Sequence, residues 1–241
     1  MNDEILLQAR GVSVHFGGVK ALDNIDFTLC KGELRCLIGS NGAGKTTFFR
    51  CLTGSQRPTM GTISFNGQVM NGAERFRIAR SGIGIKTQIP HLFEGLTALE
   101  NVWLGLRALS QPKQRDDMAR AALERVGVSA LADRIVGQLA HGQRQLVELA
   151  MVIASDPPLV LLDEPAAGMT GEEVGRLAEI ILEINRRHAL VVVEHDMNFI
   201  RLIGKRVTVF HQGKILAEDH VEGILSNPHV REVYLGKSHT T

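Results

Sequence analysis

The class of fold is decided by one stretch of sequence, which reads Leu34-Arg-Cys-Leu-Ile-Gly39-Ser-Asn-Gly-Ala-Gly44-Lys-Thr-Thr-Phe-Phe-Arg-Cys-Leu52. The β-like run Leu34–Ile38 predicts a strand, and Thr47–Leu52 predicts a helix. The glycine-rich segment Gly39–Thr46 between them ends in Lys-Thr, and this strand–loop–helix context is typical of a phosphate-binding P-loop. Its glycines let backbone N–H groups curl around phosphate oxygens at the start of a helix. The sequence therefore predicts an α/β fold built on a P-loop.

Two residues of this loop, Lys45 and Thr46, have individual predicted roles. The Lys45 ammonium would neutralise the β- and γ-phosphates, which makes it a catalytic as well as a binding residue, and the Thr46 hydroxyl would bind Mg²⁺. The predicted nucleotide-binding residues of the loop are Gly39, Ser40, Asn41, Gly42, Ala43, Gly44, Lys45, Thr46 and Thr47.

Acidic and histidine side chains follow two further apolar runs. Asp163 and Glu164 come directly after Leu159–Leu162, whose lack of alternation indicates a parallel strand covered on both faces. We expect Asp163 to provide a second Mg²⁺ ligand and Glu164 to polarise the attacking water or accept its proton. His195, just beyond the strand Leu190–Val193, is expected to reach a γ-phosphate and hold the water in line.

A second predicted anion site lies in a region of helical pattern. Ala140, His141, Gly142 and Gln143 form a glycine-containing turn before the predicted helix Arg144–Ala154, and such a turn offers N–H donors and the helix dipole. Because Lys45 already completes a phosphate site, a second one is useful if it serves the nucleotide of another copy.

Composition excludes several classes of protein. The 241 residues include 27 Lys+Arg and 26 Asp+Glu, for a net charge of +1, which argues against a nucleic-acid partner. The cluster Arg75, Arg77 and Arg80 is expected to be a solvated helix face. No apolar run approaches the roughly 18 residues that span a bilayer, and the acidic start Met1–Ile5 is unlike a signal peptide. The three cysteines lack a C-x-x-C pair, so we expect a cytosolic chain with neither disulfides nor a zinc site.

The order of patterns along the chain predicts a sheet interrupted by a helical insert. Thr97–Glu100 is a capping box for a helix carrying Val102, Leu104, Leu106 and Leu109, which we expect to break at Gln111–Gln114. The predicted strands are 5–9, 12–16, 25–29, 34–38, 62–65, 159–162 and 190–193; the other predicted helices are 115–126, 144–154, 171–187 and 197–203; and hairpin turns are expected at 66–67 and 212–213.

Taken in order, these motifs resemble those of the nucleotide-binding subunit of an ATP-binding-cassette (ABC) transporter, from about Ile5 to the end. The resemblance rests on the P-loop, Gln88 after the run Ile83–Ile85, the signature-like Leu139–Gln143, the pair Asp163-Glu164, and His195. It implies an α/β P-loop NTPase of the ABC type, with a mixed sheet core, an antiparallel β portion and a helical subdomain. The implied division of the single domain is a core of about 1–91 and 156–215, a helical subdomain of about 92–155 and a tail of about 216–241.

The resemblance also implies cofactors and partners. The cofactors would be ATP and Mg²⁺, with Phe16 stacking on the adenine and Gln88 sensing the Mg²⁺ as a ligand. Two cassettes, this chain with a second copy or with an unlike one, would sandwich two ATP molecules between P-loops and signature turns. Two membrane permease subunits would be coupled through Gln88 and the loop Ile89–Phe93, with a periplasmic or extracellular solute-binding protein acting indirectly. The chain would then lie peripherally on the cytoplasmic face of the inner membrane.

Departures from the usual motifs indicate a branch of the family. The commonest signature is Leu-Ser-Gly-Gly-Gln, but Ala140 replaces its Ser and His141 its first Gly, and Thr170 stands where an Asp is usual. Thr170–Glu173 is instead a capping box. These variants, with Phe16–Leu22, are similar to importers of branched-chain amino acids, urea and short amides, and Gly-Met-Thr170 favours the urea and amide members. The alternatives are the ATPase of a lipopolysaccharide exporter, a non-transport ABC ATPase, and a simple P-loop kinase. The ending Val230–Gly236 is similar both to this importer branch and to the exporter ATPase, so it does not discriminate between them.

Overall fold

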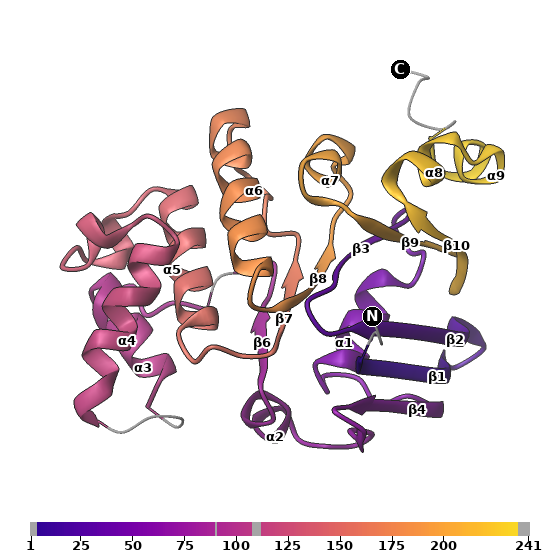
Figure 1. The fold of residues 1–241 in the computed structure, drawn as a ribbon. Helices are drawn as coiled ribbons and strands as arrows, with labels where there is room; N and C mark the ends of the chain where they lie inside the picture. The colour runs from indigo at the N-terminus through magenta and orange to yellow at the C-terminus, as the bar shows by residue number, and fades with distance from the viewer. Residues whose placement is uncertain (1–3, 90, 108–111, 236–241) are drawn as a thin grey trace.

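A six-stranded sheet organises the centre of the molecule (Figure 1), a computed structural model that describes residues 4–89, 91–107 and 112–235. Its order is β10-β9-β3-β8-β7-β6, and the five strands from β9 to β6 run parallel, while β10 is antiparallel to β9. The carboxyl ends of the parallel strands therefore share one edge. The strands are β3 (Leu34–Ile38), β6 (Ile83–Lys86), β7 (Leu159–Asp163), β8 (Ala189–Val193), β9 (Arg206–His211) and β10 (Lys214–His220).

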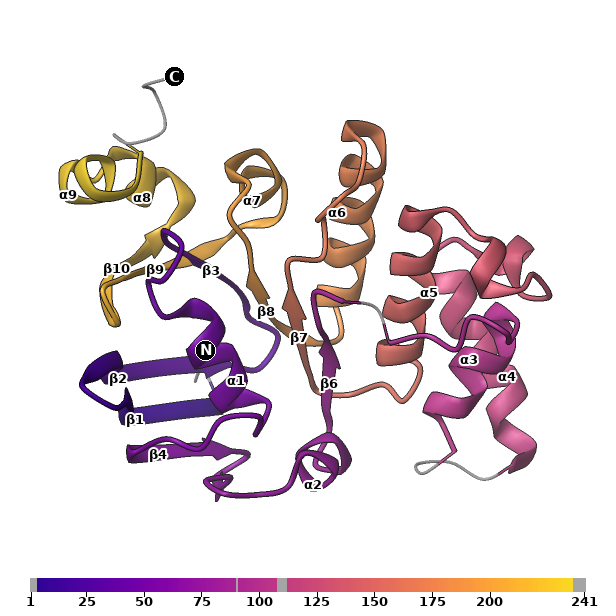
Figure 2. The same ribbon diagram turned by 180° about the vertical axis from the view of Figure 1, so that it is seen from behind.

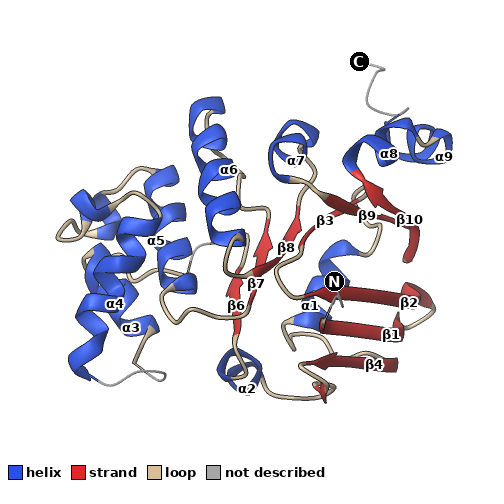
Figure 3. Ribbon diagram, in the orientation of Figure 1, coloured by secondary structure: helices blue, strands red, loops and turns tan. Residues whose placement is uncertain are grey.

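Both faces of this sheet are covered, as the continuous apolar runs predict. Successive strand residues point to opposite faces. Accordingly, Val160 and Leu162 join one apolar core, while Leu159 and Leu161 join the other. The first core is shared with α5 (His141–Ile153), α6 (Gly171–Asn185) and α7 (Met197–Ile203). The second is shared with α1 (Lys45–Leu52) and an antiparallel sheet (Figure 3).

The antiparallel sheet has the order β2-β1-β4-β5. It consists of β1 (Ile5–Phe16), β2 (Val19–Cys30), β4 (Met60–Phe65) and β5 (Gln68–Val69). The two strands predicted at 5–9 and 12–16 are wrong in one respect, because they form the single strand β1. Gly11, at φ +58°, lies in a register shift between Ala9 and Val12, so the strand bulges instead of ending. The hairpin turn predicted at Asn66-Gly67 is confirmed between β4 and β5.

A helical region, residues 98–153, stands to one side of the sheet (Figures 1 and 2). It comprises α3 (Ala98–Gly105), α4 (Pro112–Arg125), the 3₁₀ turns Ser129–Leu131 and Val136–Gln138, and α5. The capping box at Thr97–Glu100 is confirmed. The predicted break was misplaced: α3 already ends at Gly105, and Pro112 begins α4, because proline is well suited to a first helical turn. Leu109 and Gln111 lie outside the described residues.

The remaining elements flank the central sheet. The basic cluster lies on the exposed helix α2 (Arg75–Arg80), as predicted. The hairpin at Gln212-Gly213 is confirmed between β9 and β10. In the part expected to be a tail, α8 (Val221–Ser226), α9 (Pro228–Val230) and a π-helical turn (Arg231–Leu235) follow β10. Within the described residues, no helix is long and apolar enough to cross a membrane.

Candidate nucleotide-binding site

The P-loop joins β3 to α1 through three glycines in left-handed conformations. Gly39, Gly42 and Gly44 have φ values of +149°, +76° and +111°. A Cβ on Gly39 would collide with the carbonyl oxygen of Phe210, and one on Gly44 would lie 2.9 Å from that of Ala21. Backbone conformation and close packing therefore both require glycine at Gly39 and Gly44.

The N-terminus of α1 is open to an anion. Gly44 is its N-cap, no side chain caps the helix, and its first turn holds no acidic residue. The first N–H groups of a helix lack intrahelical partners and carry partial positive charge. Thr46, in this first turn, is exposed. The loop thus presents the donors that the sequence predicts for phosphate oxygens.

Lys45 is buried beneath this loop, with only 7% of its surface exposed. Its Nζ donates hydrogen bonds to the carbonyl oxygens of Gly39, at 2.6 Å, and Ser40, at 3.1 Å. Burial lowers the pKa of Lys45, and the nearby carboxylates of Glu164 and Asp163 oppose that shift. A cation held in this way lies at the loop without an acidic partner in direct contact among the described residues.

Gln88, Glu164 and His195 meet at the carboxyl edge of the sheet. Gln88 Nε2 donates to Glu164 Oε2 at 2.8 Å, and His195 Nδ1 lies 3.5 Å from Glu164 Oε1. The parallel register explains this meeting, because Lys86 pairs with Leu162 and Asp163 pairs with Val193. Residues just beyond those pairs are therefore brought side by side.

Asp163 and Glu164 differ in their surroundings. Asp163 ends β7 half-buried, and burial together with the charge of Glu164 raises its pKa to about 6. Glu164 has left-handed backbone at φ +46°, and its N–H donates to the Val193 carbonyl at 2.9 Å. Beside a bound cation Asp163 would ionise readily, since an opposite charge favours the carboxylate.

The predicted metal ligands form a set of oxygen donors. Thr46 offers a hydroxyl, Gln88 an amide oxygen and Asp163 a carboxylate. Within the described residues, no group of three or more His, Cys, Asp or Glu is arranged to hold a metal ion. A set of oxygen donors with one carboxylate fits Mg²⁺, which commonly binds through one or two carboxylates together with phosphate oxygens and water.

Glu194 is a residue of this site that the sequence analysis did not single out. Its side chain is 2% exposed, and its carboxylate accepts N–H bonds from Ala166, at 3.2 Å, and His195, at 3.1 Å. Burial raises its pKa, and these hydrogen bonds oppose the shift. Glu194 thereby ties the loop that follows Glu164 to the loop that carries His195. An acidic residue directly after an all-apolar strand was the available clue.

The turn Ala140–Gln143 differs from its prediction. It does not precede the helix, because α5 begins at His141 and not at Arg144, so His141, Gly142 and Gln143 make its first turn. Ala140, the N-cap, has no side-chain acceptor; Gln143 Oε1 accepts the Ala140 N–H at 3.1 Å. The His141 Nε2 atom lies 3.1 Å from the Ala167 carbonyl oxygen, which joins this turn to the loop after Glu164.

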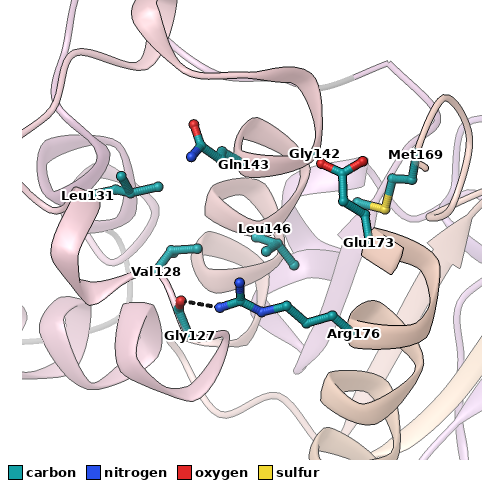
Figure 4. Close-up of a pocket in the computed structure, with 9 residues that line it drawn as sticks. All are labelled: Gly127, Val128, Leu131, Gly142, Gln143, Leu146, Met169, Glu173 and Arg176. Atoms are coloured by element: carbon teal, nitrogen blue, oxygen red, sulfur yellow. Dashed lines mark hydrogen bonds between the residues drawn. The ribbon is translucent and has the colours of Figure 1, made fainter. Parts of the chain in front are cut away.

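A cavity of about 330 Å³ lies beside this turn, between the helical region and α6 (Figure 4). Gly142 lines it, and a Cβ there would collide with the Glu173 carboxylate. Across the cavity Arg176 Nη2 donates to the Gly127 carbonyl at 2.5 Å. That bond ties α6 to the turn after α4.

The structure separates the two predicted anion sites. Lys45, Gln88, Asp163, Glu164 and His195 belong to the edge of the sheet, whereas Ala140–Gln143 belongs to the helical region. In both views β6 and β7 lie between α1 and α5 (Figures 1 and 2).

Phe16 lies at the tip of the hairpin formed by β1 and β2, and it is 51% exposed. In the same hairpin the Ala21 carbonyl lies against Gly44. The hairpin therefore contacts the P-loop through Ala21, and the exposed ring of Phe16 is available to stack on a flat base.

Comparisons with known proteins agree with this geometry. The family model for ABC transporters matches residues 22–167. The high-affinity branched-chain amino acid transport ATP-binding protein LivG of Escherichia coli (strain K12) is 38% identical over 251 residues, covering 97% of this chain and 98% of LivG. The ADP conformation of MJ1267, an ATP-binding cassette of an ABC transporter, superposes with a TM-score of 0.86 at 27% identity, covering 96% of this chain and 99% of that one. The dimeric post-hydrolysis state of the cassette MJ0796, bound to ADP and Pi, has a TM-score of 0.79 at 26% identity, covering 90% and 99%.

Proposed function

We propose that this chain, which belongs to the ABC transporter family, hydrolyses ATP to drive the import of branched-chain amino acids or similarly small polar solutes. One observation carries the proposal: Gln88, Glu164 and His195 meet at the sheet edge where the P-loop begins, in a chain similar to LivG over nearly its full length. ATP hydrolysis coupled to transport is the activity of this family.

The nucleotide is proposed to bind at the P-loop. Backbone N–H groups of Gly39–Thr47 would surround its phosphates, and Lys45 would exchange its bonds to Gly39 and Ser40 for phosphate oxygens. Thr46, Gln88 and Asp163 would hold Mg²⁺, which supplies positive charge against the charge that develops on the phosphate oxygens. Phe16 would stack on the adenine.

Glu164 is the proposed general base. Its carboxylate lies at the end of β7, where it would accept the proton of a water that attacks the γ-phosphate. Gln88 and His195 each contact a different oxygen of this carboxylate, so they fix its orientation. His195 would in addition hold the water and the γ-phosphate in line.

The turn Ala140–Gln143 is proposed to act on the nucleotide of a second cassette. It begins α5, and in both views β6 and β7 lie between α5 and α1, so the turn belongs to a different part of the molecule from this chain's own P-loop. The cassette MJ0796 is dimeric in its post-hydrolysis state with ADP and Pi, which supports the pairing of two cassettes. The second cassette would be another copy or an unlike chain, in which a stronger signature would offset the loss of the serine hydroxyl at Ala140.

Membrane permease subunits are the proposed partners of the loop after Gln88. Ile89 and Phe93 are 73% and 62% exposed, and apolar side chains gathered at the surface are typical of interaction sites. Pro90, between them, lies outside the described residues. Docking there would place the chain on the cytoplasmic face of the membrane, with a solute-binding protein acting on the other side.

The choice of solute and the division of the chain are parts of the same proposal. LivG supports branched-chain amino acids and favours an importer over the lipopolysaccharide exporter, while Gly-Met-Thr170 is the reason to test urea and short amides as well. We assign residues 1–91 and 156–215 to the catalytic core, 92–155 to the helical subdomain and 216–241 to the tail.

Glu164→Gln tests the base. Because the amide keeps the shape of the carboxylate but cannot accept a proton, we expect ATP affinity to be retained and turnover to fall at least about a hundredfold. Phosphate release and a fluorescent-ATP titration measure the two quantities. Glu172→Gln, in the exposed first turn of α6, is the matched control. Turnover that survives Glu164→Gln would show that the base has been assigned wrongly.

The same variant identifies the partners. Tagged Glu164→Gln chain, trapped with ATP and recovered from native membranes, should bring down two permease proteins and a second cassette, which mass spectrometry would identify. Exporter permeases in their place would contradict import, and recovery without any membrane protein would contradict transport.

A further inference from the structure

A buried ion pair links β6 to the middle of α5. Lys86, the last residue of β6, is 1% exposed, Glu148 is 2% exposed, and Lys86 Nζ lies 3.1 Å from Glu148 Oε2. Taking two full charges out of water is expensive, and an apolar pair of similar volume is commonly as stable or more so. Stability alone therefore does not explain why this position in the core holds charges.

The pair also holds the segment that carries Gln88. Glu148 Oε1 accepts the backbone N–H of His91 at 3.0 Å, and Lys86 Nζ lies 3.5 Å from the Thr87 carbonyl oxygen. Residues on both sides of Gln88 are thus tied to one carboxylate, directly or through Lys86. Gln88 in turn donates to Glu164, so the position of this segment sets the position of the proposed base.

The other end of the connection is the first turn of α5. Glu148 lies about two helical turns beyond His141 in the same helix, α5. A rigid helix transmits a displacement at Glu148 to the turn Ala140–Gln143. The buried carboxylate of Glu148 therefore connects the two predicted anion sites, in addition to the contact between His141 and Ala167.

We propose that Glu148, whose charge Lys86 balances in the core, is a positioning residue, which holds the segment carrying Gln88 in place against Glu164 and joins it to the helix that begins at the turn Ala140–Gln143. The inference rests on the proposed ATPase function, since Gln88 and Glu164 act only in that reaction. Glu148 is the central element, because its two oxygens serve two different partners.

Two double variants separate positioning from simple packing. Lys86→Met with Glu148→Leu removes both charges and the acceptor for the His91 N–H, whereas Lys86→Met with Glu148→Gln removes both charges but keeps an acceptor. We expect the two to melt within a few degrees of wild type, because neither leaves an unpaired charge. ATP affinity should stay within about twofold in both, since the P-loop is untouched.

Turnover should distinguish them. The leucine variant is expected to lose at least about tenfold in kcat, because small displacements of a catalytic group have large effects on rate. The glutamine variant should lose at most about threefold, because His91 keeps its anchor. Equal kcat values in the two variants would overturn the proposal. Wild-type chain without ATPase activity would instead refute the proposed function, so the two failures are distinguishable.

Amide hydrogen exchange provides a readout that needs no turnover. The His91 N–H should exchange at least about tenfold faster in the leucine variant than in the glutamine variant, because only the latter offers an acceptor. If the leucine variant does not fold, Glu148→Asp takes its place, because it keeps the charge but its shorter side chain cannot reach Lys86 and His91 together. Wild-type exchange and wild-type kcat in that variant would overturn the proposal equally.

Discussion

Helix N-termini in this molecule are of two kinds. Four helices of eight residues or more have an N-cap within the described part of the chain: α1, α3, α5 and α6. At α3 and α6 a threonine accepts the N–H of a glutamate three residues on, and that glutamate accepts the threonine N–H at 2.8 Å. At α1 and α5 the N-caps are Gly44 and Ala140, which have no side-chain acceptor.

Capped and uncapped helix N-termini serve different purposes: the first stabilise the fold, and the second can bind a ligand. A capping box satisfies the first N–H groups of a helix within the chain, and it typically contributes about 1 kcal/mol. An uncapped end leaves those groups to water or a ligand. The two uncapped ends are those that begin at the P-loop and at the signature-like turn, so the chain keeps donors open at the two places where phosphate is proposed to bind.

The two open ends are not equal. At α1 the buried ammonium of Lys45 adds a full charge to the helix dipole. In the first turn of α5 the described residues include no buried lysine or arginine, and Gln143 has already engaged the Ala140 N–H. We therefore expect most of the affinity for nucleotide to come from α1, with α5 contributing chiefly when two cassettes close on each other.

The largest expected effect comes from Lys45→Ala. Two charge-assisted hydrogen bonds to phosphate would be lost, which corresponds to about 3 kcal/mol or roughly a hundredfold in ATP affinity. Isothermal titration measures the change, with Lys31→Ala, an exposed lysine outside the P-loop, as the control. ATP binding at wild-type strength would mean that the open end of α1 is not the main nucleotide site.

A smaller effect is expected when the cap of a helix N-terminus is removed. Thr170→Ala removes the cap of α6, which should destabilise the chain by about 1 kcal/mol and lower Tm by roughly 2–4 °C. ATP affinity should not change, because this end is not a binding site. Thr170→Ser keeps the hydroxyl and serves as the control in thermal unfolding. A loss of ATP-binding free energy larger than the loss of unfolding free energy would contradict the division of helix N-termini into capped and binding ends.

The smallest effect is expected when an uncapped helix N-terminus is given a capping side chain. Ala140→Ser supplies the acceptor that α5 lacks, so it should stabilise the chain by about 0.5 kcal/mol and raise Tm by roughly 1–2 °C. The hydroxyl also restores the serine of the commonest signature. In the Glu164→Gln background, the chain should therefore form dimers at the same ATP concentration or at a lower one. Size-exclusion chromatography at graded ATP concentrations measures it; a lower Tm or a weaker dimer would contradict the interpretation.

Features encoded locally were predictable from the sequence. The P-loop follows from glycines and a lysine within one short segment, and both capping boxes follow from residues three apart. The start of α5 was placed three residues late, because Ala140 carries no capping signature. The break at Pro112 was misplaced, because proline ends one helix or begins another and only the surrounding packing decides which.

Features that depend on distant partners were not predictable. Glu148 is one acidic residue in an apolar helix until β6 brings Lys86 beside it, and Glu194 is hidden between a strand and His195. Arg35 is the same case: it is 1% exposed and pairs with Glu33 and with Glu218 at 2.6 Å, a partner in β10. The catalytic and binding roles of the site residues stay predictions that the variants above test.

The left-handed backbone at Glu164 creates a conflict between stability, which favours glycine at this position, and activity, which requires the carboxylate. At φ +46° a side chain costs about 1–2 kcal/mol, whereas glycine adopts this conformation freely. Replacement by glycine would relax the backbone while removing the proposed base. In a lineage that no longer needed ATP hydrolysis, a change to glycine at this position would be favoured early. The presence of glutamate or glycine there would therefore indicate whether selection for hydrolysis had been maintained.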